Sequence, residues 1–188
     1  MYRLSEEEPR DGPEVESLYD LCFAPGREAL SSYRLREGVA PVADLCLVAR
    51  DGEGTLAAVI RYWPVRIASA DGECEVRAQS RTVPALLLGP VAVHPTRQGE
   101  GLGALLIRES LVLARPAWER VMLVGDAPYY GRFGFRKVEG VAMPPPTNPE
   151  RVLGRALRDG AWDGVRGRVE RWAAEGLPAR GDLPCCRA

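Results

Sequence analysis

One segment limits the fold of this chain more than any other: the apolar run from Ala85 to Val93 and the glycine-rich turn behind it. The run contains no charged residue, which predicts a central strand that is buried on both faces. Glycines at 99, 101 and 103 follow, and an apolar stretch over 102–115 has the length of a helix. The sequence therefore predicts a strand, a tight turn and a helix in direct succession.

A second apolar run, from Arg120 to Gly125, follows the predicted helix. If that helix is the crossover of a β-α-β unit, the two strands lie parallel. Gly89-Pro90 interrupts the first strand. Because proline has no N–H to donate to a neighbouring strand, we expect a bulge or a local separation of strands there.

Shorter elements on both sides of this unit are predicted from residue spacing and from the positions of glycine and proline. They are a strand at 2–4, helices at 13–23 and 27–36, a hairpin of strands 45–50 and 56–67, a helix at 128–133, a strand at 135–139, and extended segments at 151–158 and 165–172. The last segment fits a helix equally well. We expect a mixed α/β fold in a single domain over 1–188, with a core over about 1–172 and a flexible tail over 173–188.

Composition limits the partners and the compartment. The chain has 25 basic and 26 acidic side chains, so no broad positive surface for nucleic acid is expected. No stretch reaches the ~20 apolar residues of a membrane helix, and the acidic start lacks a signal-peptide core. We therefore expect a cytoplasmic protein without nucleic-acid or membrane partners. Five cysteines without C-x-x-C spacing and a single histidine, His94, predict no metal site.

A glycine-rich turn at the start of a helix is suited to binding anions. Without Cβ atoms, successive N–H groups can converge on one phosphate, and the positive end of the helix dipole adds to the attraction. A Walker loop is excluded, because Ala104 and Leu105 follow Gly103 where lysine and serine or threonine are needed. A dinucleotide fingerprint fits literally as Gly99-x-Gly101-x-x-Ala104. However, the preceding strands look antiparallel, and too little chain follows for a second nucleotide-binding half.

A third interpretation is a family resemblance. Gln98-x-x-Gly101-x-Gly103 at a strand–helix junction resembles the pyrophosphate-binding motif of the GNAT superfamily of acyl-CoA N-acyltransferases. The wider stretch from 87 to 103 resembles the fourth strand and third helix of that family. A second match, Val124-Gly-Asp-Ala-Pro-Tyr-Tyr-Gly-Arg-Phe-Gly-Phe135, resembles its fifth strand and its "tyrosine, three residues, glycine-phenylalanine" helix. The chain most resembles bacterial predicted N-acetyltransferases of the YhbS type, over roughly residues 1–172.

The resemblance implies a GNAT-like fold: a mostly antiparallel sheet that splays between two parallel strands, with helices on both faces. It also implies acetyl-CoA as cosubstrate, a primary amine as acceptor and no metal. The residues implied in binding acetyl-CoA are Val91, Ala92, Val93, Gln98, Gly99, Glu100, Gly101, Leu102, Gly103 and Ala104. Tyr130 matches the family position that protonates the departing thiolate, and we expect a normal phenol pKa near 10 for it. Tyr129 is expected to pack.

The resemblance leaves three points open. The general base is unassigned: His94, a water relay or a residue in 68–80 are alternatives. The acceptor is unassigned too; Trp63, Arg66, Glu73 or Glu75 would line its pocket, although packing or surface roles fit each of them better. A non-catalytic acyl-CoA-binding or sensing module is the alternative function, with a dinucleotide-binding protein behind it. Homodimerisation through the C-terminal segment is a further hypothesis.

Overall fold

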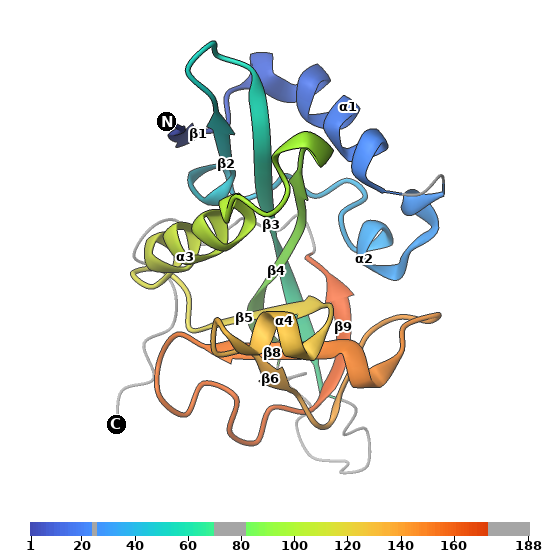
Figure 1. Ribbon diagram of the computed structural model, residues 1–188. Coiled ribbons are helices and arrows are strands. Elements are labelled where there is room, and N and C mark those ends of the chain that lie inside the picture. Colours follow the sequence, from blue (N-terminus) through green and yellow to red (C-terminus); the bar gives the residue numbers. More distant parts are fainter. Residues whose placement is uncertain (24–25, 70–81, 173–188) are drawn as a thin grey trace, which may run out of the picture.

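The computed structural model describes residues 1–23, 26–69 and 82–172 of the chain. Nine strands of this part form one sheet, and helices cover both of its faces (Figure 1). The strands are β1 Arg3–Glu6, β2 Leu47–Arg50, β3 Leu56–Ala68, β4 Thr82–Val93, β5 Arg120–Val124, β6 Arg136–Lys137, β7 Val141–Ala142, β8 Val152–Ala156 and β9 Gly167–Arg171. The α-helices are α1 Gly12–Cys22, α2 Ser31–Arg34, α3 Leu102–Ala114 and α4 Ala127–Gly131. Short 3-10 helices are η1 Pro9–Asp11, η2 Arg27–Ala29, η3 Ala43–Leu45, η4 Pro95–Arg97 and η5 Pro149–Arg151.

The sheet is mostly antiparallel, as predicted. Its strand order is β1-β2-β3-β4-β5-β8-β6, with β9 pairing to β3 and β7 pairing to β9. Among the described strands, only the β4–β5 and β7–β9 pairs are parallel. The β4–α3–β5 succession is therefore the predicted β-α-β unit. A doubly wound parallel sheet, which a dinucleotide-binding protein of the fingerprint type needs, does not form.

The long pair β3 and β4 is the centre of the molecule. Figure 1 shows α3 on one side of this pair and α1 and α2 on the other. Side chains of β3 alternate between the two sides: Ile60 and Tyr62 join the cluster beneath α3, and Val59 joins the cluster beneath α1. This alternation explains why both faces of the pair are apolar.

The bulge expected at Gly89-Pro90 is present. Ile60 pairs with Val91 and Tyr62 pairs with Leu88, so Arg61 alone stands opposite the two residues Gly89 and Pro90. Because β4 has one extra residue here, its side chains point to the same faces of the sheet as their β3 partners both before and after the bulge.

Tertiary structure corrects one sequence prediction and decides between two alternatives that the sequence left open. The helix predicted over 27–36 is two short pieces, η2 and α2, because Leu30 between them is extended, with φ −66° and ψ 143°. Leu30 is also 53% exposed, so this segment offers no continuous apolar face that would stabilise one longer helix. Segment 165–172 contains a strand rather than a helix, since β9 pairs with the half of β3 that lies beyond β2.

Some expectations concern residues that the structure does not describe. The excursion over 70–81, with Glu73 and Glu75, and the tail over 173–188 lie outside the described residues. Homodimerisation through the C-terminal segment stays a prediction. In the described part of the chain, no helix is both long and apolar enough to cross a membrane. The same part holds no group of three or more His, Cys, Asp or Glu side chains that could bind a metal ion.

Candidate functional site

The glycine-rich turn leads directly into α3. Gly99 and Gly101 have φ of +89° and +84°, a left-handed conformation that glycine adopts without a steric penalty. The first hydrogen bond of α3 runs from the Leu105 N–H to the Gly101 carbonyl, at 3.0 Å. The N–H groups of residues 102–104 therefore have no partner within the helix. They lie at the positive end of a 13-residue helix, a geometry that suits an anion.

Gly103, inside the first turn of α3, is required by close packing. A Cβ atom on Gly103 would lie 3.2 Å from the Tyr129 hydroxyl oxygen and 3.5 Å from Val93 Cγ2. The side chain of Tyr129 is 37% exposed, and its hydroxyl group lies beside the free N–H groups of α3. The sequence predicted packing for Tyr129 and gave no sign that its hydroxyl group reaches the turn.

The parallel strands β4 and β5 separate after a short contact. They pair only at Leu86 with Val121 and at Leu87 with Met122, although β4 continues to Val93. Beyond Leu87, this edge of β4 has no strand partner within the described ranges. Val91, Ala92 and Val93 therefore lie on this edge immediately before the glycine-rich turn, and the Val93 carbonyl there accepts hydrogen bonds from the side chains of Cys22 and Gln98.

Tyr130 lies on α4, just after β5. Its ring covers the Cα of Gly125, where a Cβ would be 2.3 Å from a ring carbon, and meets the Tyr129 ring edge-on at 5.0 Å between centroids. Within the described residues, the Tyr130 hydroxyl group makes no hydrogen bond. Burial raises the pKa of Tyr130 to about 12, and Arg151 opposes this only in part. The expected pKa near 10 is therefore wrong.

Comparison with solved structures finds proteins that are similar to this chain in sequence and in fold. A GNAT family N-acetyltransferase from Escherichia coli, YhbS, in complex with CoA is 28% identical, with a TM-score of 0.71 over 91% of this chain and 89% of that chain. A GNAT family acetyltransferase from Brucella melitensis in complex with acetyl-CoA is also 28% identical, with a TM-score of 0.64 over 92% and 97%. The chain is similar to GNAT family N-acetyltransferases over about nine tenths of its length. The predicted family, its acyltransferase class and the GNAT-like fold are confirmed.

More distant matches share only the GNAT fold. A protein from Corynebacterium glutamicum described as histone acetyltransferase HPA2 and related acetyltransferase is 19% identical, with a TM-score of 0.56 over 82% of this chain and 95% of that chain. No protein-family model matches the sequence. No curated protein matches it either.

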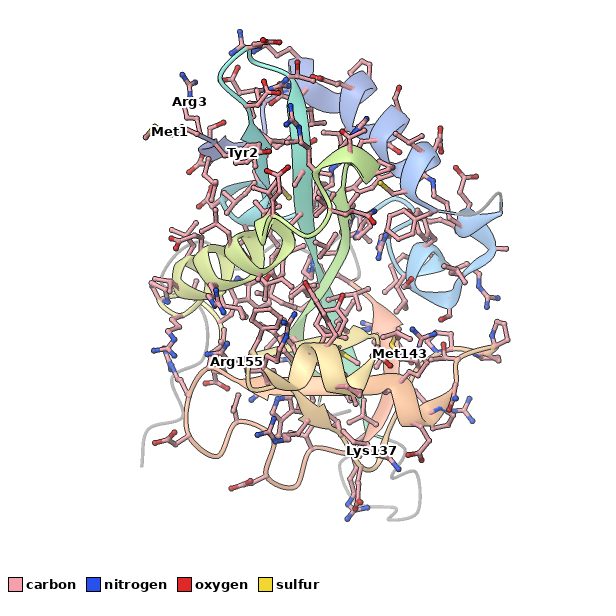
Figure 2. All side chains as sticks on the ribbon, in the orientation of Figure 1. Met1, Tyr2, Arg3, Lys137, Met143 and Arg155 are labelled. Atoms are coloured by element: carbon pink, nitrogen blue, oxygen red, sulfur yellow. The ribbon has the colours of Figure 1, made fainter. Side chains whose placement is uncertain are left out.

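Side chains around the GNAT turn hold it in place. The Tyr2 hydroxyl group, labelled near the N-terminus in Figure 2, donates to Glu100 at 2.5 Å, and this bond raises the pKa of Tyr2. Arg97 donates to Asp51 in the β2–β3 turn at 3.1 Å. The Gln98 amide donates to the Val93 carbonyl at 3.3 Å. The side chains of Arg97 and Gln98, which directly precede the turn, are therefore engaged with the protein.

A second set of contacts fixes the turn between α4 and β6. Gly134, the glycine of the second GNAT motif, has φ +80°. Arg155 on β8, labelled in Figure 2, packs 3.6 Å from the point that a Cβ on Gly134 would occupy, and it donates to the Phe133 carbonyl at 2.6 Å. These contacts attach the loop after Tyr130 to the sheet.

Neither His94 nor the β4 strand supplies an evident base. His94 Nδ1 lies 2.8 Å from the Thr96 hydroxyl and accepts from the Thr96 N–H at 3.3 Å, so its side chain caps η4. No carboxylate stands on β4.

Trp63 and Arg66, named as pocket candidates, take part in packing and ion pairing. The Trp63 ring is buried, and its Nε1 donates to the Val39 carbonyl at 3.1 Å. Arg66 pairs with Glu170 at 2.9 Å on the rim of a pocket of about 490 Å³. The sequence analysis missed Arg36, whose guanidinium group packs against Trp63. Arg36 stands at the end of the predicted helix over 27–36, and nothing in the local sequence signalled its burial.

Proposed function

We propose that the chain transfers an acetyl group from acetyl-CoA to an amine by direct attack of the amine on the thioester. The proposal rests on one observation: two sets of main-chain groups follow one another along the chain. The open edge of β4 at Val91 to Val93 leads without a break into the free N–H groups at the start of α3. This succession fits a long ligand with amide groups along its arm and phosphates at its end.

The described residues fit acetyl-CoA in chemistry. Main-chain N–H groups from Gln98 to Ala104 would hold the pyrophosphate. The edge of β4 would hydrogen-bond the amides of the pantetheine arm, as an added strand does. Two solved relatives at 28% identity contain CoA and acetyl-CoA, which supports this assignment.

Two groups of the chain would carry the chemistry. An open N–H on β4 would polarise the thioester carbonyl, as an oxyanion-hole donor does. Tyr130 would donate its proton to the departing sulfur. With a pKa of about 12, Tyr130 stays protonated at neutral pH. That pKa lies roughly 3–4 units above that of a thiol, so proton transfer has to accompany cleavage of the C–S bond.

The attacking amine must lose a proton before it reacts. We propose that water carries this proton away, because His94 caps η4 and β4 has no carboxylate. Wild-type turnover should then rise with pH as the neutral fraction of the amine grows.

Calorimetric titration with acetyl-CoA, CoA, NADH and ATP tests the proposal. Binding of acetyl-CoA and CoA alone, followed by thiol release when amines are added, is the expected result. Binding of NADH or ATP in their place would contradict it. If the chain is a non-catalytic acyl-CoA-binding module, acetyl-CoA would bind but no amine would release thiol.

A further inference from the structure

Three arginines alternate with three aromatic rings between the β3–β4 pair and the α1–α2 segment. The order along the stack is Arg61, Tyr19, Arg27, Tyr33, Arg36 and Trp63. The distances between each guanidinium carbon and the neighbouring ring centroids are 4.4 to 5.6 Å. Each contact is a cation–π interaction, which stabilises a cation most where water is excluded.

Two of the three arginines are neutralised by carboxylates. Arg61 donates to Glu7 at 2.5 and 2.8 Å and to Glu16 at 2.6 Å. Arg27 pairs with Glu16 at 2.9 Å and with Asp20 at 2.8 Å. These positive charges are balanced inside the protein.

Arg36 differs from them. No described carboxylate lies within ion-pair distance of its guanidinium group, and its Nε and Nη1 atoms are buried without a hydrogen-bond partner. Burial lowers the pKa of Arg36 to about 10, so the side chain is still a cation at neutral pH. A buried cation with unsatisfied donors is unfavourable unless an anion joins it.

The remaining nitrogen of Arg36 reaches the bulge of β4. Arg36 Nη2 lies 4.0 Å from the point that a Cβ on Gly89 would take. Gly89 stands between the residues of β4 that pair with β5 and the open edge at Val91 to Val93. The unpaired cation is therefore next to the place where the β4–β5 pairing ends.

Distance separates this cation from the anion site on α3. From Gly89 to Val93 the extended strand spans about 13 Å, at roughly 3.3 Å per residue. The free N–H groups at 102–104 lie beyond Val93. An anion at Arg36 is thus a different group from the phosphates at the turn.

We propose that Arg36 binds a carboxylate of the acceptor, so that the acceptor is an amine bearing a carboxylate, as an amino acid does, and not a polyamine. This inference rests on the proposed acetyl transfer. Arginine pairs with a carboxylate through two parallel hydrogen bonds, here from Nη2 and from one of the two buried nitrogens, which would satisfy that donor and orient the ligand. The neutral amine nitrogen then forms a bond to the thioester carbon, the C–S bond breaks, the nitrogen releases a proton and the sulfur takes one up.

The first test needs no variant. Thiol release is measured for free amino acids and for their carboxamides, which keep the amine and lose the carboxylate. We expect kcat/KM to be at least about tenfold higher for the acids, since a hydrogen-bonded ion pair is worth at least this much. The amine of a carboxamide is less basic and more of it is neutral, so amine protonation opposes the expected preference. Peptides with a free N-terminus and an acidic side chain form a second arm, which separates free amino acids from peptide acceptors.

The second test changes Arg36. Arg36→Gln should lower kcat/KM for the acid by about 10- to 100-fold, to the level of the carboxamide, and leave the Kd of acetyl-CoA unchanged. Arg36→Lys keeps the charge and should keep part of the preference, even if Arg36→Gln folds poorly. Arg34→Gln is the matched control, because Arg34 lies on α2 with an exposed side chain that donates to the Pro145 carbonyl. It should alter neither value.

The outcomes separate the two proposals. Equal rates for acids and carboxamides, with normal acetyl-CoA binding, would overturn the role of Arg36 and leave acetyl transfer standing. Failure of acetyl-CoA to bind would overturn acetyl transfer. Calorimetric titration of amino acids into wild-type and Arg36→Gln protein needs no turnover. Amino-acid binding to the wild type alone would support the carboxylate site. Equal amino-acid affinities of the two proteins would refute it.

Discussion

The Tyr129 hydroxyl group lies 3.2 Å from the point that a Cβ atom on Gly103 would occupy, over the first turn of α3. The side chain of Val93 approaches the same point to 3.5 Å. The end of β4, the start of α3 and the helix α4 therefore converge on one Cα atom. Gly99 and Gly101 are favoured by their positive φ, whereas Gly103 is helical and lies where an added methyl group would press on the Tyr129 hydroxyl group.

Gly103→Ala should weaken acetyl-CoA binding by about tenfold, because the new methyl group displaces the Tyr129 hydroxyl group into the anion site. Stability should change little, since alanine favours a helix over glycine by about 1 kcal/mol and the exposed Tyr129 side chain can move. Calorimetry gives the Kd, and thermal denaturation gives the stability.

Tyr129→Phe is the control for this contact. It removes the hydroxyl group that the new methyl group would strike, so the double variant Gly103→Ala, Tyr129→Phe should bind acetyl-CoA more tightly than Gly103→Ala alone. Strictly additive losses in the two single variants and the double variant would show that the contact does not matter.

Tyr130→Phe should lower kcat by about 100-fold or more and leave the Kd of acetyl-CoA unchanged, because it removes only a proton donor. Single-turnover thiol release and calorimetry measure the two quantities. Tyr129→Phe is the matched comparison on the same helix and should keep most of the rate. If both variants kept full activity, Tyr130 would not be the general acid.

The pH dependence of kcat follows from the raised pKa of Tyr130. A general acid works while it is protonated, so activity is lost only as pH rises through its pKa of about 12. We therefore expect no falling limb from Tyr130 between pH 7 and about 10, where a phenol with an ordinary pKa near 10 would already lose half its activity. A steady-state profile over this range checks the prediction, and a half-maximal point near pH 10 that Tyr130→Phe abolishes would contradict it.

Gly167→Ala should lower the free energy of unfolding by about 3 kcal/mol or more, because it breaks a close backbone approach. A Cβ on Gly167 would lie 1.9 Å from the Ala68 carbonyl oxygen, at a φ of +140°. Urea denaturation measures the loss. Gly164→Ala is the control: its φ is +69° with nothing within 4 Å of the added Cβ, so only the left-handed conformation is penalised, by about 1–2 kcal/mol. Equal losses in the two variants would argue against the pairing of β9 with β3.

The sequence alone determined the elements whose signals are local. The apolar run at 85–93, the three glycines and the following helix predicted β4, the turn and α3, because burial on both faces and positive φ are properties of short segments. The motif ending in Gly134-Phe135 also pointed to α4 and to Tyr130. The bulge at Gly89-Pro90 could be predicted because proline lacks an N–H.

Only the tertiary structure decided what depends on segments far apart in the chain. The separation of β4 from β5, the pairing of β9 with β3 and the approach of Tyr129 to Gly103 depend on strand register and on packing between such segments. The raised pKa of Tyr130, and the lack of a carboxylate partner for Arg36 among the described residues, depend on which groups surround a buried hydroxyl or charge. A local pattern specifies backbone conformation and which face is buried; the neighbours that meet there are set by the folded chain as a whole.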